Sequence, residues 1–131
     1  MENATGLSSH PQAPTPGERL RQGIALFNRG EFYECHEVLE AAWLDASGGQ
    51  KMFLQGVIQL AVAFFHLRRG NSAGSSRLMR AAVEKLSGCA GAAPVDLPAL
   101  LEPLQSLAGR IEAGQIPPDF PAPEIRLLPA P

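Results

Sequence analysis

From Met52 to Leu67 no residue carries a charge, and apolar side chains dominate the run. A helix that spans a membrane needs about 20 predominantly apolar residues. This run is shorter than that, and Gln55, Gln59 and His66 interrupt it. We therefore expect it to form the buried central helix of an all-helical domain, with no association with a membrane.

Helical spacing of apolar residues recurs on both sides of this run, and no alternation typical of a strand is present. The predicted helices span about 16–29, 31–45, 50–69, 72–87 and 97–111, with a loop over 47–49. Pro103 lies inside the last of them and predicts a kink or a late start of the helix there. The predicted fold is an all-α compact bundle of about five helices, built from short-turn helical hairpins that allow tetratricopeptide-like packing.

The helix ends carry local signals. Thr15 and Glu18 have the spacing of a capping box, with Pro16 at the first helical position. Residues 26–30 and 66–70 both end in Arg-Gly, forty residues apart, and each is followed directly by the next predicted helix. Such a repeat indicates two helical hairpins of the same design, whether it arose by duplication or by chance.

The length of 131 residues suits a single domain. Residues 1–14 are rich in Pro, Ser and small polar types and are expected to form a disordered arm. The helical domain is expected over 15–114. A Pro-rich extended tail over 115–131 is expected to lie on its surface.

The composition argues against several classes of protein. A net charge of −2 disfavours nucleic acid as the partner, because such proteins usually carry a basic face. Cys35 and Cys89 form neither a C-x-x-C pair nor a disulfide framework, which fits a reducing compartment. The N-terminal residues lack the basic start and apolar run of a signal peptide. We therefore expect a cytoplasmic protein, or a stromal one in a plastid.

The second predicted helix carries the most informative polar residues. On a helical wheel, His36 falls within the apolar face, between Phe32 and Trp43. Glu40 lies one turn after His36, on the flank of the same face, whereas Glu37 points further outward. At this spacing the Glu40 carboxylate can accept a hydrogen bond from the imidazole and fix its tautomer.

The third predicted helix offers a second set of polar side chains, because Gln55, Gln59 and His66 fall within one narrow sector of an apolar cylinder. If this sector meets the edge formed by His36 and Glu40, the polar groups converge beneath the indole of Trp43. The predicted ligand-binding pocket consists of His36, Glu37, Glu40, Trp43, Gln55, Gln59 and His66.

Two segments together resemble a known family. The first is Phe32–Trp43, with the pattern His36-Glu37-x-x-Glu40-x-x-Trp43, and the second is 53–61, which continues to His66 and to Gly70-Asn71. They resemble the domain-of-unknown-function 309 family over about residues 16–86. The resemblance implies a compact helical fold and brings no established activity with it.

The sequence leaves three functions open. The preferred one is a module that binds a small molecule or a protein partner, with Tyr33, Trp43 and Phe65 lining a groove. The second is a small hydrolase or lyase with His36 as base and Glu37 or Glu40 orienting it, although no nucleophile motif accompanies them. The third is a purely structural polar network, with function on another surface.

The sequence also leaves metal binding and self-association open. His36, Glu40 and His66 are ligand types for zinc or non-haem iron, with Gln59 or water completing the shell. However, Glu40 stands where an H-E-x-x-H motif has its second histidine, so no metal or other cofactor is assigned. The long apolar helix could also pack at a homodimer interface.

Overall fold

The computed structural model describes residues 14–89, 91 and 93–129. Within these residues the chain forms six α-helices and one short 3-10 helix, with a single isolated β-bridge. The elements are α1 (Pro16–Asn28), α2 (Phe32–Leu44), α3 (Gly48–Arg68), α4 (Ser72–Ser87), α5 (Leu97–Leu101), η2 (Glu102–Leu104) and α6 (Leu107–Glu112). The predicted all-α class is confirmed. No helix in the described part of the chain is long and apolar enough to cross a membrane.

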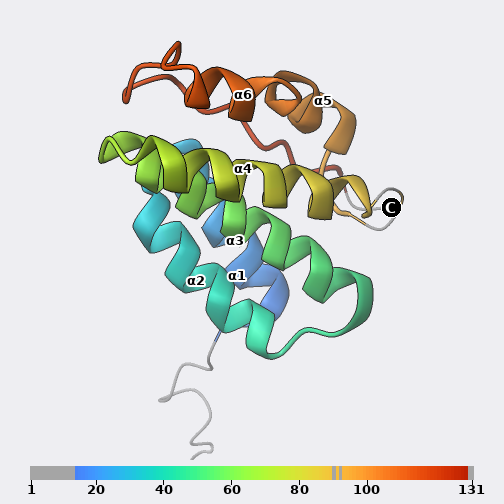
Figure 1. The fold of residues 1–131 in the computed structure, drawn as a ribbon. Helices are drawn as coiled ribbons and strands as arrows, with labels where there is room; N and C mark the ends of the chain where they lie inside the picture. Colours follow the sequence, from blue (N-terminus) through green and yellow to red (C-terminus); the bar gives the residue numbers. More distant parts are fainter. Residues whose placement is uncertain (1–13, 90, 92, 130–131) are drawn as a thin grey trace, which may run out of the picture.

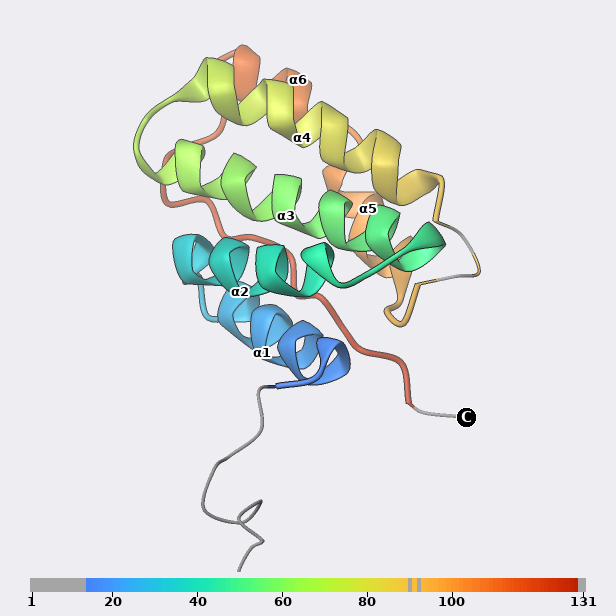
Figure 2. The ribbon, with the colours of Figure 1, turned by 90° about the horizontal axis from the view of Figure 1, so that it is seen from below.

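The first four helices lie side by side in chain order, each packed against the next (Figure 2). They form two helical hairpins, α1–α2 and α3–α4. The last helices lie over α4, on the far side of it from α3 (Figure 1). The compact bundle of short-turn hairpins expected from the sequence is therefore present.

The starts of α1, α4 and α5 carry side-chain caps, and the predicted helix starts agree with the structure except at α3. The backbone N–H of Thr15 donates to Glu18 (2.7 Å) and the backbone N–H of Glu18 donates to the Thr15 hydroxyl (3.1 Å). This bonding holds the pKa of Glu18 below its ordinary value. The exception is α3, which begins at Gly48, two residues before the predicted Gln50. Ser47 is extended and Gly48 has φ 59°, which glycine adopts at no steric cost, so the loop turns directly into the helix.

The helix ends at Gly30 and Gly70 share one geometry. These glycines have φ values of 80° and 78°. After α1 the backbone N–H of Glu31 donates to the carbonyl of Leu26 (2.9 Å), and after α3 that of Asn71 donates to the carbonyl of His66 (2.8 Å). Both are Schellman-type closures, so the two hairpins turn in the same way forty residues apart.

Pro103 interrupts the predicted fifth helix as expected, and the break is complete. Because proline lacks a backbone N–H, the chain passes through η2 and resumes a helix only at Leu107. The resulting α5 and α6 are short, and both bury leucines against α4.

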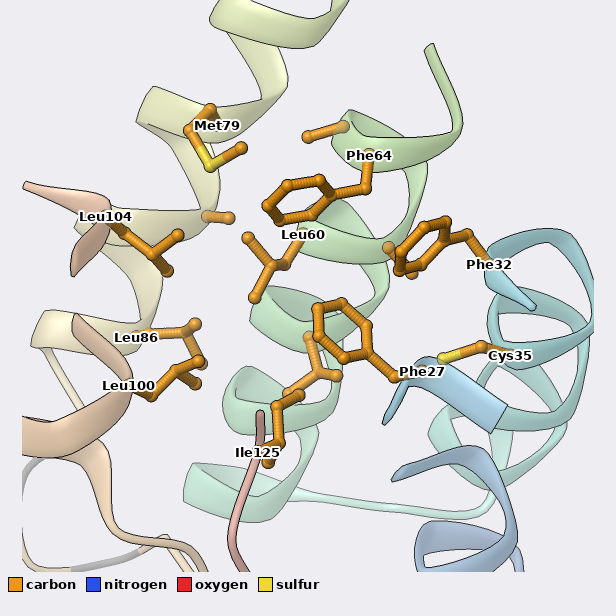
Figure 3. Packing of buried hydrophobic residues seen from close by; sticks show 14 of the residues in the cluster. Phe27, Phe32, Cys35, Leu60, Phe64, Met79, Leu86, Leu100, Leu104 and Ile125 are labelled. Atoms are coloured by element: carbon orange, nitrogen blue, oxygen red, sulfur yellow. The ribbon is translucent and has the colours of Figure 1, made fainter. Parts of the chain in front are cut away.

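Aromatic side chains from three helices meet in the core. The ring centroid of Phe27 lies 5.2 Å from that of Phe32 and 6.0 Å from that of Phe64, in edge-to-face arrangements. Phe32 stacks on Phe64 at 5.5 Å. Leu60, Met79 and other aliphatic residues extend this cluster towards α4 (Figure 3). The α1–α2 hairpin is thereby joined to α3 by a continuous apolar contact.

The tail over 115–129 contains no helix, and it does more than cover the surface. It runs from α6 past the end of α3 and on beside α1 (Figure 2). Ile116 and Ile125 are buried, with 8% and 2% of their surface exposed. The tail therefore contributes to the core. The disordered arm predicted over 1–14 lies outside the described residues, apart from Pro14.

Candidate functional site on α2 and α3

His36 contacts acceptor oxygens through both ring nitrogens. Its Nε2 lies 3.6 Å from Oε2 of Glu40, and its Nδ1 lies 3.0 Å from the backbone carbonyl oxygen of Tyr33. The His36 side chain is 23% exposed and that of Glu40 is 57% exposed. The helical spacing therefore brings the pair together, but in a solvated setting where such a contact is worth only about 0.2–1 kcal/mol.

Glu37 faces away from His36. It borders a hollow of about 420 Å³ between α1 and α2, together with Arg19 and Gln22 of α1. This placement follows from the helical period, because adjacent residues on a helix point about 100° apart. Glu37 therefore contributes charge to α2 without sharing a pocket with the imidazole.

Trp43 lies near the opposite end of α2, partly buried. Its indole Nε1 is buried and has no hydrogen-bond partner among the described residues. The ammonium group of Lys51 lies 4.1 Å from the ring centroid, within cation–π range. Sequence reasoning missed Lys51, because helical spacing within α3 does not show that its side chain reaches the Trp43 ring on α2.

The polar sector of α3 contacts the start of α4 through His66. Gly56 packs against Leu86 of α4, and Gln59 lies three residues further along α3, one turn from that contact. The Gln59 side-chain oxygen is buried and has no hydrogen-bond partner in the described part of the chain. Nδ1 of His66 lies 3.2 Å from the side-chain amide nitrogen of Asn71, the N-cap of α4, which can donate to it. Gln55 is partly buried on the same sector.

Two aromatic residues connect the polar groups of the two helices. Tyr33 lies 5.3 Å from His36 and 5.7 Å from Phe65, measured between ring centroids. Phe65 lies 6.1 Å from His66, and the guanidinium of Arg69 lies 5.5 Å from the Phe65 ring. The two histidines thus stand at opposite ends of one aromatic row.

We call this surface the α2–α3 face. It consists of Tyr33, His36, Glu40 and Trp43 of α2, with Lys51, Gln55, Gln59, Phe65 and His66 of α3.

The face does not bring together a cluster of metal ligands. No group of three or more His, Cys, Asp or Glu side chains stands close enough to hold an ion within the ranges that the structure describes. Of the three metal-ligand types that the sequence offers, only His36 and Glu40 approach each other. His66 pairs instead with Asn71, so the geometry assembles a surface with aromatic and polar character.

The comparison with known families decides the assignment of this region. Residues 20–78 match the sequence model of a family described as Domain of unknown function (DUF309). This stretch of the chain is similar to the DUF309 family and makes up less than half of the 131 residues. The resemblance inferred from the motifs of α2 and α3 is thereby confirmed, and every residue of the predicted pocket lies inside the matched range.

Two relatives extend the comparison. The Uncharacterized protein YpuF of Bacillus subtilis strain 168 is 41% identical over 86 residues, which cover 63% of this chain and 49% of that protein. An uncharacterized protein of Aquifex aeolicus strain VF5 is 29% identical over 73 residues, which cover 55% of this chain and 22% of that protein. The chain therefore spans about half of the length of the first relative and less than a quarter of the second.

Proposed function

We propose that this domain is a binding module that engages a protein partner through the α2–α3 face. One observation carries the proposal. Tyr33 leaves 50% of its surface exposed while its ring contacts His36 and Phe65. An exposed aromatic side chain held by neighbouring rings loses little conformational freedom on binding, and tyrosine and tryptophan dominate interface energetics.

The charge of α2 indicates the chemistry of the partner. Glu34, Glu37 and Glu40 are exposed, and α2 contains no lysine or arginine. Carboxylates around an aromatic anchor favour a partner segment with basic side chains beside apolar ones. An amphipathic helix with lysine or arginine along its polar face meets both requirements.

The shape of the face favours a macromolecule over a small ligand. A small-molecule site normally encloses most of its ligand, whereas the predicted residues spread along two helices and Glu37 borders a separate hollow. The unpartnered Trp43 Nε1 supports the same proposal. Lys51 covers the indole with a flexible side chain, and its displacement would give a partner access to this donor. We expect this binding to take place in the cytoplasm.

The direct test is photo-crosslinking of the full chain in cells that express it naturally. A benzophenone amino acid replaces Tyr33, and a second chain carries it at the exposed Gln105 as a control. We expect a discrete adduct from position 33 that disappears with Glu37→Lys plus Glu40→Lys. The matched pair Glu84→Lys plus Glu102→Lys should leave the adduct intact. An adduct that also forms from position 105, or that survives the reversal on α2, contradicts the proposal.

The contacts of His36 keep an enzyme as the second candidate. If Nδ1 donates to the Tyr33 carbonyl, Nε2 holds the lone pair that a general base needs, beside Glu40. A hydrolase or lyase of this kind should show turnover that His36→Ala abolishes. Panels of ester, amide and phosphate substrates that yield no turnover sensitive to His36→Ala would remove this candidate.

A further inference from the structure

The tail runs past the C-terminal ends of α1 and α3 (Figure 2), and side chains of both helices contact its main chain there; we call this seat of the tail the groove. Asn28, the last residue of α1, binds both polar backbone groups of Ile125. Its side-chain nitrogen donates to the Ile125 carbonyl (2.9 Å), and the Ile125 N–H donates to its side-chain oxygen (2.8 Å). Because both bonds go to backbone atoms, this paired contact recognises an extended main chain. It does not depend on which side chain stands at position 125.

Arg68, the last residue of α3, makes a second contact of the same kind. Its Nη1 donates to the carbonyls of Pro118 (2.8 Å) and Phe120 (2.9 Å). The guanidinium lies 5.2 Å from the ring of Phe32, which holds it in place. Desolvation lowers the pKa of this guanidinium, and the carboxylate of Asp119 opposes the shift, so an acidic residue suits this position.

Within residues 117–129 of the tail, Ile125 is the one side chain that is buried in the core. Ile125 is 2% exposed and joins the cluster that contains Phe27 (Figure 3), whereas Glu124 and Arg126 on either side of it are exposed. Beyond Ile125 the tail forms an isolated antiparallel β-bridge, in which Leu127 pairs with Val95. The N–H of Asp96 donates to the Arg126 carbonyl (2.9 Å), and that of Leu128 donates to the Pro94 carbonyl (2.8 Å). Backbone pairing with a single buried anchor is a common mode of peptide recognition.

Asn28 and Arg68 lie within the DUF309 match, and the tail lies beyond it. We propose that this groove is a binding site for an extended segment of a partner protein, and that the tail is its built-in competitor. The segment would carry prolines, an acidic residue for Arg68 and an isoleucine-like anchor for the Ile125 position. This site shares no residue with the α2–α3 face and is independent of the function proposed for it.

Because the tail is tethered, its high effective concentration disfavours any competitor in the intact chain. The test therefore weakens the tail without altering the groove. The probe is a fluorescent synthetic peptide of residues 117–128, and binding is measured by anisotropy to the full chain. We expect Ile125→Ala in the protein to bind the peptide at least tenfold more tightly than the wild type.

Matched variants show whether the tighter binding of the peptide takes place in the groove. Asn28→Ala added to Ile125→Ala should remove the gain, whereas Gln22→Ala, at an exposed amide on the same helix, should leave it unchanged. A probe peptide that itself carries Ile125→Ala should not bind. Equal affinity of wild type and Ile125→Ala for the probe, or a gain that survives Asn28→Ala, overturns the proposal.

Hydrogen exchange of the wild-type protein tests the proposal even if Ile125→Ala does not fold. A displaceable tail releases the amides of Asp96, Ile125 and Leu128 in a local opening. These amides should exchange at least tenfold faster than those of the core helices, and their rates should rise together. Exchange of the three amides only at the rate of global unfolding would make the tail a fixed part of the core and overturn the proposal.

Discussion

At the scale of single residues, close helix contacts depend on glycines that the sequence does not single out. A Cβ added at Gly56 would lie 2.7 Å from Cδ2 and 2.8 Å from Cγ of Leu86, a fully buried side chain. We predict that Gly56→Ala lowers the free energy of unfolding by about 1–3 kcal/mol, through overpacking of α3 against α4. Urea denaturation measures this change. Gly109→Ala is the control, since nothing lies within 4 Å of its Cβ position, and it should stabilise by about 0.5–1 kcal/mol.

Cys35 should behave as an inert core residue. It is fully buried, and burial raises the pKa of its thiol to about 12. We predict that a thiol reagent at pH 8 leaves Cys35 unmodified in the native protein and modifies it in urea. Because the folded pKa exceeds the unfolded one, the thiol contributes stability that is complete below pH 9 and falls as the pH rises towards 12. Rapid native labelling of Cys35 would contradict this placement.

The effect of replacing His36 on stability distinguishes a binding surface from a structural network. Its contact with Glu40 is solvated and its ring is partly exposed. We predict that His36→Ala changes the free energy of unfolding by less than about 1 kcal/mol, as expected for a surface pair. A loss of several kcal/mol in urea denaturation would instead favour a polar network that holds α2 and α3 in register.

At the scale of elements, each hairpin depends on a glycine with positive φ at the end of its first helix. Gly70 has φ 78°, which alanine adopts only with strain, so Gly70→Ala should destabilise the protein by about 1 kcal/mol. Gly88 ends α4 with φ −79°, and Gly88→Ala should cost much less. Thermal unfolding of both variants measures the difference. Equal losses at the two positions would contradict the role of the left-handed turn.

The elements also show where sequence reasoning succeeds. Caps, Arg-Gly stops and the Pro103 break are local signals, and they predicted the helix order and most of the boundaries. The sequence placed the start of α3 too late, because two glycines at 48 and 49 are typical of a loop. Only the structure shows that Ser47 is extended and that the helix begins directly after it. The i,i+4 approach of His36 and Glu40 was also predicted from spacing alone. The surroundings of Gln59 and the pairing of His66 with Asn71 depend on how α3 is rotated against α2 and α4. Helical spacing does not fix that rotation.

At the scale of the whole molecule, the tail shows what the sequence could not reveal. Its extended form follows from its prolines, but its burial depends on contacts between Asn28 and Ile125, which stand 97 residues apart in the chain. An isolated isoleucine in a Pro-rich segment carries no periodic signal. Similarly, Tyr33 and Phe65 were expected to line a groove, but their role as the link between two histidines required the packing of α2 on α3.

The central claim is that the α2–α3 face binds a protein, and the dissociation constant of the crosslinked partner tests it most directly. The measurement compares wild type, Tyr33→Ala, Glu37→Lys plus Glu40→Lys, and the control pair Glu84→Lys plus Glu102→Lys. The account predicts at least tenfold weaker binding for the first two variants, or about 1.4 kcal/mol, and less than a twofold change for the control pair. Wild-type affinity in both α2 variants would contradict the account.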